Sequence, residues 1–273
     1  MRAGDRESVD EKKQTARHRC RAGQVIAGSR FGAALAKELA AKGATVIIAD
    51  IAREKAQEVA AALGECAHAI ALDVSNPEQM DSVVRQVKSD FDAVDLFFNN
   101  AGTSTYGEAC DVPLAEWERV LTVNLMGVIY GSLSAYRVMK EQGSGRIINI
   151  GSASVFTCDP LLGPYVTSKF GVVGFTRVLA LEAEAYNVGV IVVCPGNIRT
   201  PLLNLKEPSW LTPAISAESA ARCVLRGIMH NRKIIVFPLR WRFVWWLDRL
   251  SPALLNPLRR VIVRRARRRK SSD

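Results

Sequence analysis

The feature that most constrains the fold of this 273-residue chain is a regular alternation, from Phe31 onward, of short β-branched runs with longer helical patterns. Strands connected by helices of this length run parallel within one sheet. Strands are expected over residues 44–50, 67–73, 94–100, 145–151, 188–195 and 233–237. Helices are expected over residues 33–42, 51–63, 77–91, 114–142, 165–186 and 217–230. The predicted fold class is α/β, a single doubly wound parallel sheet with helices on both faces.

The segment before this alternation departs from the pattern. A first strand should precede the first helix, yet residues 11–24 carry more charges than a buried strand accommodates. Only residues 24–27 could serve as that strand. We therefore expect residues 1–22 to be disordered or an aberrant N-terminus, and we hypothesise a frameshift or a mis-started reading frame. Resequencing of the coding DNA would decide this.

The positive charge of the chain is concentrated near its C-terminus. The net charge is +10, but residues 232–273 hold 13 lysines and arginines against 2 acidic residues, so the remainder is nearly neutral. The body has no basic face and no recognition motif, so nucleic acid is not an expected partner. The six cysteines are scattered without a CxxC pair or clustered histidines, which indicates reduced thiols and no metal site.

Residues 239–273 form a basic amphipathic C-terminal tail. Three of the five tryptophans lie in it: Trp241, Trp245 and Trp246. Tryptophan suits the membrane–water interface and arginine can reach lipid phosphates, so we expect peripheral contact with a bilayer. Pro252 and Pro257 should break the tail into two short helices. The alternative is that the tryptophans pack on the body and the last dozen residues only solubilise the chain.

The N-terminus is charged and lacks the apolar core of a secretory signal, and no run of about 18 apolar residues occurs. We therefore expect a cytoplasmic protein whose tail associates with membranes.

Asp50 closes the strand expected over residues 44–50, about 20 residues after the turn that follows the candidate strand 24–27. A carboxylate at this place accepts hydrogen bonds from a dinucleotide ribose and repels a 2′-phosphate. The next residue is Ile51 rather than a basic one, and both features favour NAD over NADP. The alternative is a solvated acid at a strand end. The strand over 94–100 is followed by small residues that let a cofactor lie against the backbone. The candidate contacts there are Asn100, Ala101 and Gly102.

An ordered set of polar fragments follows. Asn124 lies in TVNLMG, Ser152 in NIGSAS, Tyr165 and Lys169 in YVTSK, and PGNIRT begins at Pro195. Each fragment alone recurs by chance, and a tyrosine on a helix is usually packing. Together, their order and spacing over residues 25–237 resemble the short-chain dehydrogenase/reductase family. The resemblance implies a Rossmann-type catalytic domain over residues 23–238 that transfers hydride between NAD and an alcohol or ketone.

Tyr165 and Lys169 lie four residues apart, so they share one face of a helix and the ammonium can approach the phenol. Lowering a tyrosine pKa from about 10 to about 7 requires roughly 4 kcal/mol, which we expect Lys169 and the positive nicotinamide to supply. Tyr165 would then be the general base for oxidation and the general acid for reduction, while Ser152 hydrogen-bonds the substrate oxygen. The resemblance adds that Lys169 binds the nicotinamide ribose and that Asn124 holds a proton-relaying water.

The resemblance also assigns the first turn, which reads TGxxxGxG in the family and VIAGSRFG here. Val25 replaces the threonine, and Ile26 and Arg30 replace two glycines, so we expect weakened affinity for the cofactor. The residues expected at the pyrophosphate are Gly28, Ser29, Phe31 and Gly32.

By the same resemblance, Asp73 and Val74 contact the adenine. The Pro-Gly loop, residues 195–200, orients the nicotinamide and so fixes the face from which hydride leaves. Its expected contacts are Pro195, Gly196, Ile198 and Thr200.

Residues 201–216, where the family places a substrate lid, are rich in leucine, which favours a lipophilic alcohol or ketone such as a steroid, retinoid or fatty alcohol. The family pairs subunits through the helices expected over 114–142 and 165–186, so a homodimer or homotetramer is expected. The degraded first turn motivates an alternative, a catalytically impaired nucleotide-binding or membrane scaffold protein. The complete set from Asn124 to Lys169 argues against it.

Overall fold

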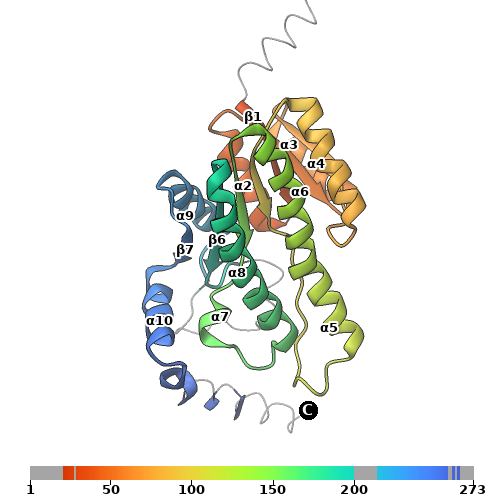
Figure 1. The fold of residues 1–273 in the computed structure, drawn as a ribbon. Helices are drawn as coiled ribbons and strands as arrows, with labels where there is room; N and C mark the ends of the chain where they lie inside the picture. Colours follow the sequence, from red (N-terminus) through yellow and green to blue (C-terminus); the bar gives the residue numbers. More distant parts are fainter. Residues whose placement is uncertain (1–20, 28, 200–213, 258–259, 262, 265–273) are drawn as a thin grey trace, which may run out of the picture.

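A computed structural model describes residues 21–27, 29–199, 214–257, 260–261 and 263–264. Seven parallel strands of this part of the chain form one sheet in the order β3-β2-β1-β4-β5-β6-β7 (Figure 1). The strands are β1 Arg21–Ala27, β2 Ala44–Asp50, β3 Ala67–Ala71, β4 Val94–Asn99, β5 Gly145–Ile150, β6 Val188–Pro195 and β7 Ile234–Phe237. The order of the strands reverses between β1 and β4: from β1 the sheet is built outward to β3, and from β4 it is built in the other direction to β7. A ligand crevice opens at the carboxyl ends of the strands at such a point. The predicted fold class is confirmed.

Helices cover both faces of this sheet (Figure 1). They are α2 Arg30–Ala40, α3 Arg53–Leu63, α4 Pro77–Phe91, α5 Leu114–Leu121, α6 Gly127–Gln142, α7 Ser154–Thr157, α8 Gly163–Ala183, α9 Ala217–Met229 and α10 Leu239–Leu250. All six expected helices are confirmed; α4 has the expected bounds, α5 and α6 together span the expected 114–142, and the others have shifted ends. The one expected over residues 114–142 consists of α5 and α6 joined by a π-helical turn, Thr122–Met126. Sequence patterns did not reveal the four-residue α7.

The hydrophobic core lies in two layers, one on each side of the sheet. Neighbouring strand residues alternate between them, because successive side chains of a strand point to opposite faces. Ile48, Phe98 and Ile148 pack beneath α2, α3 and α9. Ile47, Phe97 and Ile147 pack beneath α4, α6 and α8. This burial on both faces explains why the strands read as continuous apolar runs.

Strand β1 begins three residues earlier than expected. Its register shifts between Arg21 and Gln24, and from Gln24 onward it pairs regularly with β2 and β4. The polar residues therefore occupy the amino end of the strand, and the expected segment 24–27 lies in the centre of the sheet.

The tail differs from expectation in two respects. Trp241 is buried and Trp245 is half-buried against a small cluster with Ala153, Val155 and Phe156, so only Trp246 is largely exposed. The packing alternative therefore holds for two of the three tryptophans. None of the described helices is long and apolar enough to cross a membrane.

The two prolines of the tail, each expected to break it, give different outcomes. α10 ends at Leu250, and Pro252 opens a short 3-10 turn, as expected for a break. Pro257 was expected to break the tail but lies within the next helical stretch. Proline is tolerated in the first turn of a helix, where its missing N–H has no partner to lose.

Candidate active site

Tyr165 and Lys169 lie in the first two turns of α8, which begins at Gly163 with Pro164 in its first turn. Lys169 is buried, and its Nζ donates a hydrogen bond of 2.8 Å to the carbonyl oxygen of Ile150 at the end of β5. The same Nζ lies 5.7 Å from the centroid of the Tyr165 ring. The four-residue spacing therefore brings the two groups together at the carboxyl end of β5.

Ser152 follows β5 by two residues and is buried beside them. Its Oγ accepts a hydrogen bond of 3.1 Å from the backbone N–H of Ser154, which fixes its orientation. The Ser152 side chain also hydrogen-bonds the Tyr165 phenol. The end of β5 and the start of α8 thus bring three of the predicted catalytic residues, Ser152, Tyr165 and Lys169, close together.

Asn124 lies in the π-helical turn between α5 and α6 and is completely buried. Such single π turns are frequent at functional sites because the extra residue redirects one side chain. The Asn124 Oδ1 accepts from the N–H of Thr103, and its Nδ2 donates to the carbonyl of Thr103, each at 2.8 Å. Nδ2 also donates to Ser168 Oγ at 3.1 Å, which links Asn124 to α8.

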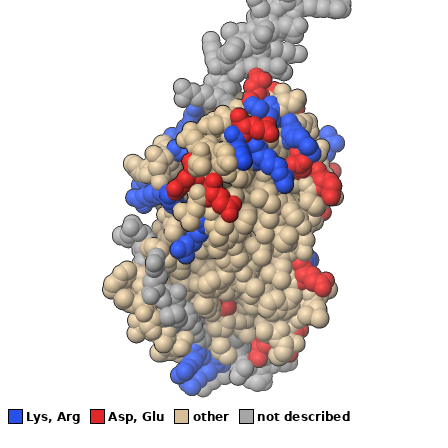
Figure 2. Space-filling model, in the orientation of Figure 1, with Lys and Arg blue, Asp and Glu red and all other residues tan. Residues whose placement is uncertain are grey.

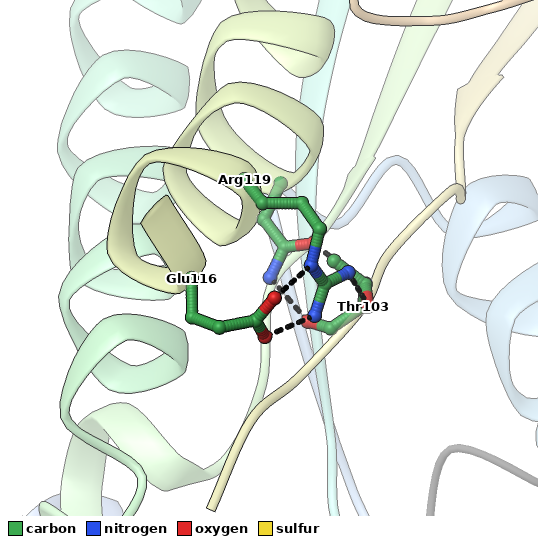
Figure 3. Close-up of polar contacts among 4 residues, drawn as sticks. Thr103, Glu116 and Arg119 are labelled. Atoms are coloured by element: carbon green, nitrogen blue, oxygen red, sulfur yellow. Dashed lines mark hydrogen bonds and ion pairs between the residues drawn. The ribbon is translucent and has the colours of Figure 1, made fainter. Parts of the chain in front are cut away.

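Thr103, whose backbone binds Asn124, is itself held by Arg119 of α5 (Figure 3). Arg119 forms a two-pronged ion pair with Glu116, at 3.0 and 2.8 Å, and donates a hydrogen bond of 2.6 Å to Thr103 Oγ1. The ion pair raises the pKa of Arg119 and lowers that of Glu116. Arg119 therefore supports Asn124 indirectly, through the backbone of Thr103.

A buried polar network lies behind this site and connects the elements that carry it. Asn99 Nδ2 donates to Ser132 Oγ at 3.1 Å and to Asn149 Oδ1 at 2.8 Å. Asn149 Nδ2 donates to Thr176 Oγ1 at 3.0 Å. These bonds join β4, α6, β5 and α8. Gly131 of α6 has to be a glycine, because a Cβ there would collide with Asn99 Oδ1.

Burial dominates the electrostatics of the site. It lowers the pKa of Lys169 to about 8, because the charged form loses solvation. Burial raises the pKa of Tyr165, although the hydrogen bond with Ser152 acts in the opposite direction. For the protein groups alone, desolvation of the phenolate outweighs its neighbours. The expected lowering also depends on the positive nicotinamide and stays a prediction.

The first turn keeps part of its expected arrangement. Ser29 caps α2, its Oγ accepting from the N–H of Gly32 at 2.9 Å and from Asn100 Nδ2 at 2.8 Å. The Phe31 side chain packs in the core, so only its backbone can contact a cofactor. Gly28 lies outside the described residues. The N–H groups of this helix start face the crevice side of the sheet, which suits a pyrophosphate.

The residues expected to contact the adenosine lie at the carboxyl ends of β2 and β3. Asp50 is partly exposed, its Oδ1 accepting from the N–H of Ala52 at 2.9 Å, and Ile51 beside it is largely exposed. The Asp73 carboxylate accepts from the N–H and hydroxyl of Ser75. A hollow next to them is lined by residues that include Ala49, Leu72, Val74, Asn100 and Ala101.

The other end of the crevice is formed by Gly102 and the Pro-Gly loop. A Cβ at Gly102 would lie 3.5 Å from Asn124 Oδ1 and 3.8 Å from Lys169 Nζ, so the backbone of this glycine lies close to both residues. Pro195 ends β6, and Ile198 is nearly buried where the loop pairs with Ile215. Thr200 lies outside the described residues.

Comparison with known proteins decides the family. The model of the short chain dehydrogenase family matches residues 25–209, more than half of the chain. The chain belongs to this family. It is therefore an oxidoreductase of hydroxyl and keto groups that uses a nicotinamide cofactor.

Similar short-chain dehydrogenases differ in their named substrates. A 3-alpha-(or 20-beta)-hydroxysteroid dehydrogenase of Mycobacterium bovis is 36% identical over 65% of this chain and 69% of the relative. A D-beta-hydroxybutyrate dehydrogenase of Rhizobium meliloti is 34% identical over 77% of this chain and 85% of the relative. The crystal structure of a 3-ketoacyl-(acyl-carrier-protein) reductase of Brucella melitensis complexed with NADH is 26% identical, with a TM-score of 0.75 over 81% of this chain and 97% of that one.

The sequence did not reveal the residues that hold the catalytic set of this short-chain dehydrogenase in place. Thr103, Ser168 and the carbonyl of Ile150 bind Asn124 and Lys169, but they are ordinary residue types with no motif of their own. Ser168, which lies next to Lys169 in YVTSK, carried the only available signal. Its hydroxyl donates to the carbonyl of Tyr165 at 2.6 Å within α8 and accepts from Asn124 Nδ2, so it links the π-helical turn to α8.

Proposed function

We propose that the chain transfers hydride between NAD and a lipophilic secondary alcohol or ketone, with Tyr165 as the general acid and base. One observation carries the proposal: Ser152, Tyr165 and Lys169 converge at the carboxyl end of β5, with the backbone of Gly102 beside Lys169.

The chemistry divides among the chain's residues. The Ser152 hydroxyl holds the substrate oxygen, and Tyr165 takes the alcohol proton in oxidation or gives one to the carbonyl oxygen in reduction. The Lys169 ammonium, held by the Ile150 carbonyl, stabilises the phenolate and binds the nicotinamide ribose. NAD supplies the hydride acceptor and a positive ring charge that favours the phenolate. Asn124 holds the water that carries the proton onward from Lys169.

The other residues would bind the cofactor along the crevice. The start of α2 with Ser29 and Gly32 suits the pyrophosphate, Asp73 and Val74 the adenine, and the Pro-Gly loop the nicotinamide. NAD rather than NADP is supported by Asp50, whose carboxylate would repel a 2′-phosphate, and by the apolar Ile51 beside it.

An apolar substrate is supported by the leucine-rich lid, residues 201–216, of which 201–213 lie outside the described part of the chain. The test is a panel of secondary alcohols, from short to steroid-sized, assayed by NADH formation with NAD and NADP in turn. We expect kcat/KM to rise with apolar surface and to be larger with NAD. Preference for a small hydrophilic alcohol would overturn the substrate class, and no turnover with any alcohol or ketone would favour the scaffold alternative.

We further propose a homodimer or homotetramer. α8 exposes an apolar stripe at helical spacing, formed by Phe170, Val178 and Leu181. Figure 2 shows that most of the face over α6 and α8 carries few charged side chains. An apolar, weakly charged helix face of this kind is typical of a subunit contact. Light scattering of the wild type and of Val178→Asp tests it: a single monomeric mass for both would contradict the proposal.

We also propose that the protein is cytoplasmic and that the tail after Pro238 makes peripheral contact with a membrane. The support is the combination of tryptophans and 11 basic residues over residues 240–270.

A further inference from the structure

α10 is unusual because it is apolar on two opposite sides. Its inner face consists of Trp241, Val244 and Trp245, which pack on the body. Its outer face consists of Phe243, Trp246 and Leu250, at a spacing of three and four residues, and each of these is more than half exposed. A surface helix normally has a polar outer side, so the outer face requires a partner.

The outer face continues beyond α10 and is accompanied by positive charge. Phe243 and Trp246 stack with ring centroids 6.4 Å apart, and Leu254 in the next turn is also more than half exposed. Arg260 and Arg264 follow on exposed positions of the last described helical stretch. Figure 1 places α10 and this stretch together at one end of the molecule, the end toward which the strands run.

The inner face contacts the two segments that frame the nicotinamide end of the site. Trp241 lies so close to Gly196 that a Cβ on the glycine would collide with its Nε1. That Nε1 is buried and has no hydrogen-bond partner among the described residues. Trp245 packs on Phe156 of α7 with centroids 6.1 Å apart. α10 therefore packs against the Pro-Gly loop and against the segment that follows Ser152.

We propose that the outer face of α10 docks on an anionic phospholipid bilayer and that the inner face transmits this docking to the Pro-Gly loop. The inference rests on the proposed membrane contact and specifies its surface, its lipid and its effect on the site. Aromatic and leucine side chains enter the interface while the following arginines pair with lipid phosphates. Trp241, seated on Gly196, couples the position of α10 to the loop that orients the nicotinamide.

Charge argues for a bilayer rather than for a second copy of the chain. In a twofold interface the same patch meets itself, so two segments that each carry 11 basic residues over 240–270 would be brought together. Their like charges would repel, whereas an anionic surface attracts both the arginines and the aromatic residues.

Co-sedimentation with vesicles tests the docking. Wild type is compared with Phe243→Ser/Trp246→Ser on phosphatidylcholine vesicles with and without phosphatidylglycerol. The matched control is Tyr186→Ser/Met229→Ser, which removes exposed apolar residues at the amino end of the sheet. We expect the α10 variant to lose at least about tenfold in partitioning, because two apolar side chains no longer enter the bilayer interface, and the control to bind like wild type.

Wild-type binding should require phosphatidylglycerol and weaken as salt is added. Equal binding of the α10 variant and wild type, or no binding of wild type, would overturn the docking. Light scattering without vesicles tests the alternative that a second copy of the chain binds this face. A change of oligomeric mass in the α10 variant alone would show that a second copy does so.

The link to the site is tested by NADH fluorescence titration with and without anionic vesicles. We expect the NADH Kd of wild type to change several-fold on vesicle binding and that of the α10 variant to stay constant. An unchanged Kd in wild type that is fully vesicle-bound would refute the coupling. Sedimentation does not depend on turnover, so an inactive chain that binds vesicles would contradict the proposed enzyme alone, and an active chain that does not bind would contradict the docking alone.

Discussion

The two halves of the sheet hold their functional residues in different ways. In the half formed by β4, β5 and β6, the proposed catalytic residues and the elements that carry them are fixed by buried side-chain bonds such as those of Asn124, Asn149 and Lys169. In the half formed by β1, β2 and β3, Asp50 makes a local bond at the edge of the crevice. Ser29 there makes one local bond, to Gly32, and one bond to Asn100, which follows β4. Changes in the first half should therefore abolish turnover or destabilise the fold, whereas changes in the second should tune the choice and affinity of the cofactor.

The largest effect is expected in the catalytic half. Tyr165→Phe removes only the ionisable oxygen, so turnover should fall by at least about 100-fold while NADH binding stays nearly unchanged. Steady-state rates and fluorescence titration measure the two quantities. Tyr186→Phe, outside the site in the 3-10 turn that follows α8, is the control and should keep wild-type activity. A Tyr165→Phe enzyme with more than about a tenth of the wild-type rate would refute the assigned role.

A change in the cofactor half should alter preference without abolishing turnover. Asp50→Ala with Ile51→Arg removes the carboxylate that repels a 2′-phosphate and adds a guanidinium that pairs with it. A charged hydrogen bond contributes about 1.5–3 kcal/mol, so the ratio of kcat/KM for NADP over NAD should rise by at least about tenfold. Asp50→Ala alone should give a smaller shift. An unchanged ratio would mean that Asp50 is only a solvated strand end.

The pH dependence should reflect the buried lysine. Burial lowers the pKa of Lys169 to about 8, so its ammonium is present below that pH and is lost above it. Carbonyl reduction needs the ammonium and a protonated Tyr165, so its rate should fall above about pH 8, by up to about tenfold per pH unit. Lys169→Arg stays charged over this range and should lose the decline, at a lower absolute rate. A wild-type rate that stays flat to pH 10 would contradict this account.

The smallest effect concerns the network behind the site. Asn149→Ala leaves buried partners without hydrogen bonds, so the free energy of unfolding should fall by about 1–3 kcal/mol, measured by urea denaturation. Thr176→Val keeps the shape but removes the same bond. The double variant should therefore lose less than the sum of the two single variants. Strict additivity would show that the two side chains are energetically independent.

The sequence predicted the fold well because strands buried on both faces and joined by helices leave a clear alternation. It predicted β1 least well, since the polar residues before Gln24 conceal the amino end of the strand. It missed α7, which is only four residues long. For the tail it predicted the break at Pro252, but it could not show which tryptophans face the body.

In the site, the sequence predicted which residues meet but not what holds them. The four-residue spacing placed Lys169 beside Tyr165, and the structure confirms this proximity. Spacing indicates a neighbouring charge but not the burial of the phenol, which raises the pKa of Tyr165. The support from Thr103 depends on a long-range contact that no local pattern encodes.

The central claim is that this chain binds a nicotinamide dinucleotide across both halves, although Ile26 and Arg30 stand where the family has glycines. Titration of the full chain with NADH, monitored by the quenching of tryptophan fluorescence, tests this claim most directly. The account predicts saturable binding, with a Kd below millimolar but weaker than that of relatives whose first turn is intact. The absence of any binding at millimolar NADH would contradict it.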